Sequence, residues 1–137
     1  MTEHFSFEVH TPNRLFYSDS VEAVVLTLID GEAAVYANHE IFSAPVIPCL
    51  IKIKESGGTW KTAFTAEGIL EVTKNKTVLI SDAAEWPAEI DNERAIAAKE
   101  KAEDTLKNSM LKFEKETAAA ALKRADMRIK AYLTNPK

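Results

Sequence analysis

The sequence predicts an α+β fold in which an N-terminal antiparallel β-sandwich, residues 1–84, precedes a linker and a C-terminal antiparallel two-helix hairpin, residues 85–137. Two observations predict this division. Short apolar segments separated by turn residues continue up to Asp82, a pattern typical of an antiparallel sandwich or barrel rather than of alternating strands and helices. Beyond Asp82, alanine and charged residues dominate, and neither Gly nor Pro occurs between Ile90 and Asn135, which favours helix.

The first predicted strand contains Phe5, Phe7 and Val9, which alternate with polar residues and therefore share one face. Further strands are predicted over residues 21–29, 33–36, 50–53, 60–66, 69–72 and 77–80. Turn residues separate them at 30–31, 55–58, 67–68 and 74–76. Trp60 and Trp86 are expected to supply apolar packing area, as large aromatic side chains usually do.

Small apolar residues at helical spacing predict the two helices. The first stripe is Ala95, Ala98, Ala102 and Leu106, and the second is Ala118, Leu122, Ala125, Ile129 and Leu133. We expect the chain to reverse at residues 107–110, with one long interrupted helix as the alternative, since Asn and Ser weaken a helix without forbidding it. An alanine seam buries little apolar area, so such a hairpin is weakly held and suited to a conformational switch.

Composition bounds the class of protein. The 137 residues, with 46% hydrophobic and 28% charged residues, predict a soluble globular chain. The formal charge of −4 gives no case for nucleic acid, although residues 122–137 carry five basic residues and one acid, which leaves −8 for the rest. Cys49 lies in an apolar run and is expected to be a buried thiol of a cytosolic protein. No signal peptide or membrane span is expected, so membrane association would be indirect.

Four charged residues of the helical part form the candidate site. Asp91 and Arg94 are three residues apart, and Arg124 and Arg128 are four apart, so each pair shares one helix face. A hairpin that brings the pairs together would create a phosphate site. The structural alternative makes Asp91 an N-cap and the arginines a solvated basic helix end, and spacing alone favours it.

Motifs along nearly the whole chain resemble the epsilon subunit of bacterial F-type ATP synthase. In the sandwich they are FSFEVHTP at 5–12, FYS at 16–18, VEAVV at 21–25, GE at 31–32, Tyr36, His39, GILEV at 68–72 and VLISDAAE at 78–85. In the helices, IDNERA at 90–95 is similar to the ATP-binding pattern of that family, and LKRADMR at 122–128 is similar to its basic second-helix segment. The order of these motifs is specific.

The resemblance implies three sets of site residues. The residues that would surround ATP are Glu85, Ile90, Asp91, Arg94, Arg124 and Arg128. The candidates for contact with the c-ring lie in the loop from Tyr36 to Phe42 and are His39 and Phe42, with an exposed turn histidine and a core phenylalanine as the alternative. The residues that would contact the catalytic subunits during inhibition are Lys123, Arg124, Arg128 and Lys130. Guanidinium groups suit phosphate oxygens, and a carboxylate accepts from ribose or adenine donors.

Two departures limit this transfer of roles. Lys101 stands where ATP-binding relatives can have arginine, which removes bidentate geometry. Residues 37–42 read ANHEIF, whereas relatives often have Pro-Gly-His followed by Ala-Pro.

The resemblance implies a non-catalytic rotor subunit of a proton-translocating ATP synthase. Its sandwich would bind the gamma subunit and the c-ring, and its hairpin would inhibit hydrolysis at the alpha/beta catalytic head. No cofactor is required, ATP would act as a regulatory ligand, and the place would be the cytoplasmic face of the bacterial plasma membrane, peripherally. Three histidines without metal spacing and the absence of a glycine-rich phosphate loop argue against an enzyme. The alternative is a sandwich adaptor whose hairpin is a permanent docking element without nucleotide.

Overall fold

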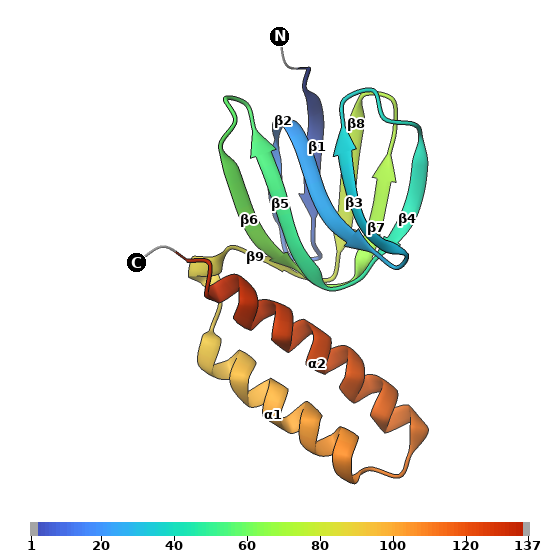
Figure 1. Cartoon of the computed structure of the whole chain (residues 1–137), viewed down its shortest axis with the longest axis vertical. Coiled ribbons are helices and arrows are strands. Elements are labelled where there is room, and N and C mark those ends of the chain that lie inside the picture. The colour runs from blue at the N-terminus through green and yellow to red at the C-terminus, as the bar shows by residue number, and fades with distance from the viewer. Residues whose placement is uncertain (1–2, 136–137) are drawn as a thin grey trace. The chain divides into compact units, whose positions relative to one another are not determined.

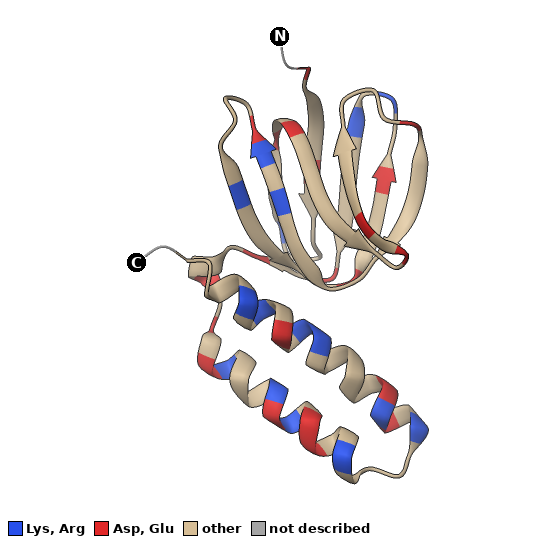
Figure 2. Cartoon of the chain, viewed as in Figure 1, with Lys and Arg blue, Asp and Glu red and all other residues tan. Residues whose placement is uncertain are grey.

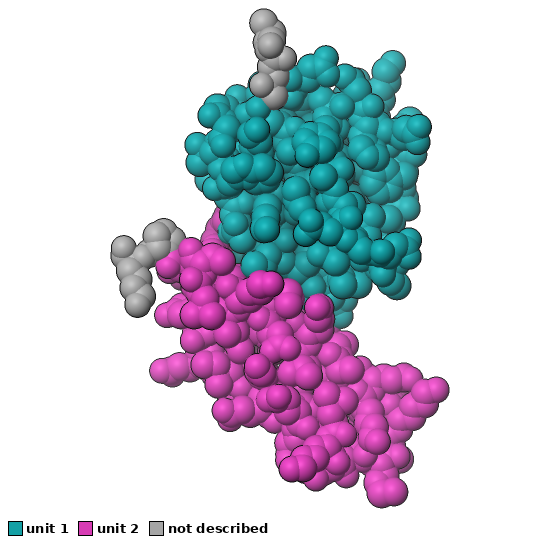
Figure 3. All heavy atoms as spheres, viewed as in Figure 1, with its two compact units in different colours: residues 1–85 teal, residues 86–137 magenta. Residues whose placement is uncertain are grey.

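The computed structural model describes residues 3–135 and divides the chain into two compact units, Met1–Glu85 and Trp86–Lys137 (Figure 3). The first unit holds the strands and the second holds the helices (Figure 1). The division falls one residue after the predicted end of the sandwich. Of the basic residues in the C-terminal segment, Lys137 lies outside the described residues.

The strands of the first unit form two layers that share one long strand (Figure 1). The strands are β1 Phe5–His10, β2 Leu15–Leu28, β3 Gly31–Tyr36, β4 Phe42–Val46, β5 Cys49–Glu55, β6 Trp60–Thr65, β7 Gly68–Val72, β8 Lys76–Ser81 and β9 Ala84–Glu85. The first layer has the order β4-β7-β8-β1, and the second has the order β3-β2-β5-β6-β9. The first half of β2 pairs with β1 and its second half with β3 and β5, so β2 joins the layers.

One strand pair departs from the antiparallel prediction. β1 and β8 run parallel, with Phe7 opposite Thr77 and Val9 opposite Leu79. A parallel pair needs a long connection between its strands, and here most of the sandwich lies between them. Local turn signals carry no information about such a pair, so this pairing could not be predicted from them.

The core lies between the two layers and consists of the side chains that point inward from the strands. Phe7, Ile51, Leu70 and Leu79 are fully buried, and the alternation predicted for residues 5–9 is confirmed because Ser6 and Glu8 are only half-buried. The Cys49 thiol is buried, as expected, and its Sγ accepts a hydrogen bond from the backbone N–H of Thr27 at 3.4 Å. Removing one of the large core side chains would cost about 2–5 kcal/mol of folding stability.

Two polar groups at the margin of this core are satisfied by side chains. The hydroxyl of Tyr17 donates to Oε2 of Glu55 at 2.8 Å, and Lys61 Nζ lies 3.4 Å from the same oxygen. Burial, followed by the Glu55 carboxylate, raises the pKa of Tyr17 far above its ordinary value. Thr65 donates its hydroxyl proton to Oγ of Ser81 at 2.8 Å and so links β6 to β8 inside the sandwich.

Gly68 is required by the close approach of β7 to β8. A Cβ at this position would lie against the backbone oxygen of Ile80 and 2.9 Å from Cα of Ser81. Backbone atoms in a sheet cannot move aside as a flexible side chain can, so only glycine fits here. Gly68, the second residue of the predicted turn at 67–68, therefore serves close strand packing as well as chain reversal.

The second unit is an antiparallel hairpin, with η1 Pro87–Glu89, α1 Asn92–Asn108 and α2 Lys112–Tyr132 (Figure 1). The reversal occurs at residues 109–111, within about one residue of the prediction, so the single interrupted helix is excluded. Four buried alanines form the seam between α1 and α2: Ala95, Ala102, Ala118 and Ala125. The prediction that Ala98 and Leu133 are buried in the stripes is wrong, because Ala98 is exposed and Leu133 is 75% exposed.

Candidate functional site

The hairpin has two distinct flanks. Buried alanines mark the inward face of each helix, and each residue turns about 100° farther around the axis. Because the helices are antiparallel, residues just before the buried alanines lie on one flank in both helices, and residues just after them lie on the other. Arg94 precedes Ala95 and Arg124 precedes Ala125, and Arg128, one turn after Arg124, lies on the same flank. We call this the arginine flank.

Asp91 stands at the start of the arginine flank and caps α1. Its Oδ1 accepts a hydrogen bond from the backbone N–H of Arg94 at 3.1 Å. The N-cap role foreseen as the structural alternative is therefore confirmed. The cap also holds the Asp91 carboxylate against the backbone of Arg94, so Asp91 stays on the arginine flank while it caps the helix.

Asn92, the first residue of α1, contributes an unusual acceptor. Its Oδ1 is buried and has no hydrogen-bond partner among the described residues. An unsatisfied buried acceptor costs about 1–3 kcal/mol. Asn92 is three residues before Ala95 and seven before Lys99, so it lies on the flank away from the arginines, outside the candidate ATP site. The sequence offered no sign of this, since the burial of one amide oxygen depends on the packing of the hairpin.

A groove of about 430 Å³ continues the arginine flank toward the helix reversal. Lys101 and Phe113 lie at its rim. Its floor is formed by alanines from both helices, namely Ala98, Ala102, Ala118 and Ala121. Lys101, which the sequence analysis singled out, therefore lies on the same flank as the predicted site residues. Phe113 is 78% exposed.

The other two predicted ATP residues lie before α1. Ile90 is buried and follows η1. Glu85 is half-buried on β9, where it pairs with Phe64, and so belongs to the first unit. Thus five of the six residues predicted to surround ATP lie in the second unit.

The opposite flank carries an ion pair between the helices. Lys99 Nζ lies 3.1 Å from Oδ1 of Asp126, and both side chains are 39% exposed. The hydrogen bond with Asp126 is the main cause that raises the pKa of Lys99. Figure 2 shows acidic and basic residues along both helices.

The two remaining residues predicted for inhibitory contact, Lys123 and Lys130, are exposed.

The loop before β4 presents an exposed aromatic and apolar surface. His39 is exposed, and its ring centroid lies 5.2 Å from that of Phe42, which is half-buried rather than part of the core. Tyr36 is 59% and Ile41 is 73% exposed. The backbone turns at Asn38 with φ of 63°, and the Asn38 amide donates to Glu3. We call residues 36–42 the tip loop.

The outer face of the first layer carries exposed isoleucines that the sequence analysis did not single out. Ile69 on β7 lies opposite Ile80 on β8, and they are 50% and 52% exposed. Pro45 on β4 extends the row, since it pairs with Ile69. Two adjacent apolar residues, Ile69 and the buried Leu70, show that both faces of β7 are apolar, which is the signal that was available.

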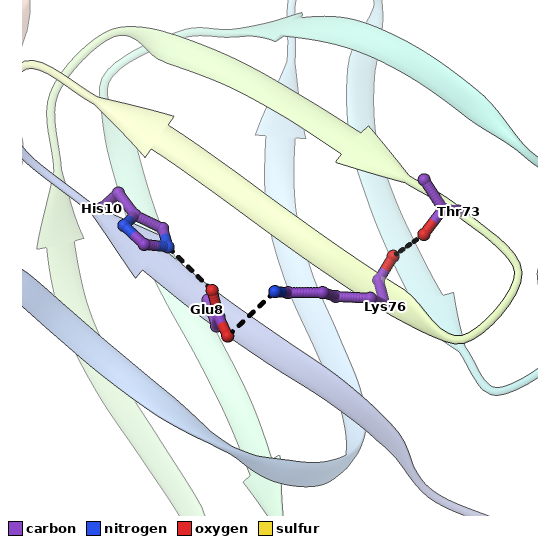
Figure 4. Close-up of polar contacts among 4 residues, drawn as sticks. All are labelled: Glu8, His10, Thr73 and Lys76. Atoms are coloured by element: carbon purple, nitrogen blue, oxygen red, sulfur yellow. Dashed lines mark hydrogen bonds and ion pairs between the residues drawn. The ribbon is translucent and has the colours of Figure 1, made fainter.

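A polar cluster borders this isoleucine row. Glu8 on β1 contacts His10 Nε2 at 2.8 Å and Lys76 Nζ at 3.1 Å, and Thr73 donates its hydroxyl to the Lys76 carbonyl (Figure 4). These contacts, the histidine first, lower the pKa of Glu8. The cluster gives the outer face of the first layer an apolar row with a charged margin.

The opposite outer face corrects one expectation. Trp60 is 51% exposed and therefore does not serve core packing as predicted. It begins a cross-strand row that continues through Lys54 and Ala23 to Tyr36. Trp86 is half-buried.

Within residues 3–135, no cluster of His, Cys, Asp or Glu is arranged to hold a metal ion. No described helix has the length and apolar character needed to cross a membrane.

Family models match the chain in two parts. The beta-sandwich domain of the ATP synthase delta/epsilon chain matches residues 4–87, and the long alpha-helix domain of the same chain matches residues 88–132. Among curated relatives, the ATP synthase epsilon chain of Caldicellulosiruptor saccharolyticus is 47% identical over 92% of this chain and 91% of its own length. That of Caldanaerobacter subterraneus subsp. tengcongensis is 42% identical over 95% and 94%.

A solved structure shares the fold. A chain of the Euglena gracilis mitochondrial ATP synthase matches with a TM-score of 0.81 at 20% identity, over 95% of this chain and 81% of that one. Since both domain models match in order and the epsilon chains align over most of the sequence, this chain belongs to the ATP synthase delta/epsilon family and is a non-catalytic subunit of ATP synthase.

Proposed function

We propose that the chain works in the central stalk of a proton-translocating ATP synthase, where it couples rotation to ATP synthesis and regulates ATP hydrolysis. It would be held peripherally, through the complex, at the cytoplasmic face of a bacterial plasma membrane. The observation that carries the regulatory part is the arginine flank on a hairpin closed by an alanine seam. The sandwich would supply the permanent contacts.

The isoleucine row is the proposed contact with the gamma subunit. Ile69 and Ile80 are half exposed side by side, and the charged margin around Glu8 resembles the polar rim of protein interfaces. Exposed apolar side chains that adjoin on one sheet face favour partner binding. Ile80→Glu should weaken binding to purified gamma subunit at least tenfold, whereas the matched change Trp60→Glu on the other outer face should not. Equal effects of both changes would contradict this assignment.

The tip loop is the proposed contact with the c-ring. The His39 and Phe42 rings are in tilted contact at the loop, and Ile41 beside them is 73% exposed. Exposed apolar and aromatic side chains beside polar ones suit a contact at the surface of a membrane-embedded ring. The departure from the relatives' loop changes which side chains make the contact. Crosslinks from a cysteine at position 41 to c-subunits in the assembled complex would test it.

The hairpin is the proposed regulatory element, and ATP its ligand. Asp91, Arg94, Arg124 and Arg128 share one flank, where guanidinium groups suit phosphate oxygens and a carboxylate suits ribose or adenine donors. ATP bound to the closed hairpin would stabilise that state by preferential binding. Of the other residues predicted for ATP, Ile90 is buried directly before Asp91, and Glu85 belongs to the first unit.

The open hairpin would inhibit hydrolysis. Lys123 and Lys130 are exposed, and with Arg124 and Arg128 they give α2 a basic surface for acidic segments of the alpha/beta catalytic head. The same two arginines would thus serve ATP in the closed state and the catalytic subunits in the open state. This competition would link ATP concentration to inhibition.

Calorimetric titration of ATP into the isolated chain, beside an Arg124→Ala/Arg128→Ala variant, tests the nucleotide part. We expect saturable binding that the double substitution removes. Absence of binding by the native chain would reduce Asp91 to a helix cap.

The second candidate, a constitutive adaptor, is favoured only by the capping role of Asp91. Truncation after Glu89 separates the candidates. Retained gamma binding with loss of inhibition supports regulation, and loss of assembly supports the adaptor.

A further inference from the structure

The ion pair between Lys99 and Asp126 joins the two helices on the flank away from the arginines. Its Nζ–Oδ1 distance is 3.1 Å. Another ion pair of the hairpin, Lys112–Glu116, lies within α2 at spacing i,i+4 and connects no two elements. Both pairs join an ammonium group to a carboxylate, but the pair within α2 is longer, at 3.8 Å, and more exposed, and only Lys99–Asp126 connects the two helices.

The seam by itself specifies the register of the helices weakly. The buried alanines recur every seven residues in each helix, at 95 and 102 and at 118 and 125. Identical methyl groups can re-form part of their contacts after a seven-residue slip, which moves one helix by about 10 Å along the other. Leucine side chains would interlock and resist the slip. A single polar or charged contact is known to select one register among apolar alternatives.

We propose that Lys99 and Asp126 are a positioning pair that fixes the hairpin register and thereby holds Arg94 and Arg128 within reach of one polyphosphate. Arg94 lies five residues before Lys99, and Arg128 lies two residues after Asp126 on the antiparallel helix. In this register the two arginines are offset along the hairpin by about 4.5 Å, at 1.5 Å per residue. A seven-residue slip would change that offset by about 10 Å. The nucleotide part of this inference rests on the proposed ATP sensing.

Two substitutions that each remove one charge distinguish a positioning role from a direct electrostatic effect on the bound phosphate. Lys99→Met removes a positive charge, and Asp126→Asn removes a negative one. If the residues acted only through their charge on a bound phosphate, the first change would weaken ATP binding and the second would strengthen it. If they act by positioning, both changes weaken it. The matched control is Lys112→Met and Glu116→Gln in the pair within α2.

Hairpin opening is measured without nucleotide by amide hydrogen exchange in α1 and α2 of the full chain. Each single substitution should raise the opening constant about 2- to 5-fold, the double substitution no more than either single one, and the swap Lys99→Asp/Asp126→Lys should restore it. Salt at 0.5 M should produce the same increase in the native chain and little in Lys99→Met. ATP affinity, measured by calorimetry, should fall by a similar factor in both singles and recover in the swap.

Additive effects of the two substitutions, or equal effects in the control pair, would overturn the proposal. Opposite changes of ATP affinity in Lys99→Met and Asp126→Asn would also overturn it. Failure of the native chain to bind ATP would refute the proposed sensing and the nucleotide part of this inference. The exchange measurements would still decide whether the pair fixes the hairpin.

Discussion

The alanine seam makes a direct prediction for Ala125→Leu. Ala125 is 2% exposed at the centre of α2, facing α1. Each buried methyl contributes about 0.8 kcal/mol, so the four seam alanines supply about 3 kcal/mol together. Forcing a leucine into a close helix contact costs about 1–3 kcal/mol. The substitution should therefore consume much of the seam's contribution, although it adds apolar surface and leaves helix propensity nearly unchanged.

Amide hydrogen exchange, resolved by segment, provides the assay. In Ala125→Leu, we expect exchange in α1 and α2 to rise about 5- to 150-fold, which corresponds to about 1–3 kcal/mol. Exchange in β5, β7 and β8 should stay at the native level, because these strands belong to the other compact unit. The control is Ala119→Leu, the same change at an exposed position of the same helix.

Unchanged or slower helix exchange in Ala125→Leu would refute the reasoning, because it would mean that the helices have room for a larger side chain and that the seam is not closely packed. A parallel rise in the strands would refute it differently, by showing that the two units unfold together. Equal acceleration in Ala119→Leu would point to a general effect of leucine on α2.

Three further predictions concern the sandwich. Gly68→Ala should lower the free energy of unfolding by about 1–3 kcal/mol in urea titrations, because its Cβ would press on the Ile80 backbone; a neutral result would mean that β7 can shift. The raised pKa of Tyr17 means that ionisation is harder in the folded chain, so stability should fall as pH rises above its ordinary value of 10.0, and Tyr17→Phe should remove that slope. The lowered pKa of Glu8 has the opposite sign: its contribution is present above 4.5 and is lost as pH falls below it, so Glu8→Gln should make thermal stability less dependent on pH there.

Local patterns predicted the two parts of the fold because each part is dictated by neighbours in sequence. Alternation at Phe5, Phe7 and Val9 gave a strand, and the long segment without Gly or Pro gave helices. Pairings between distant segments leave no such trace. The parallel β1–β8 pair and the exposed Ile69–Ile80 row depend on which strands meet, and strand order was not visible in the sequence.

The candidate site divides in the same way. Spacing alone placed Asp91 with Arg94 on one helix face and Arg124 with Arg128 on another, and the resemblance added Glu85 and Ile90. That all four share one flank follows from the position of the buried alanines, which the predicted stripes gave only in part. Ala98 was assigned to the seam but is exposed and lines the groove. A three- or four-residue spacing defines a stripe about half a turn wide, so its margin cannot be told from its centre.

Alanine at the seam has a physical consequence for a regulatory hairpin. A leucine seam would fix both closure and register through interlocked side chains, but its larger buried area would make opening rare. An alanine seam lowers the free energy of opening, but it also specifies the register of the two helices less well. An interhelical ion pair such as Lys99–Asp126 restores register at small cost in stability, since an exposed pair contributes only about 0.2–1 kcal/mol. A hairpin built in this way can open readily and still close with its arginines in the same arrangement each time, and that is the property a ligand-sensitive switch requires.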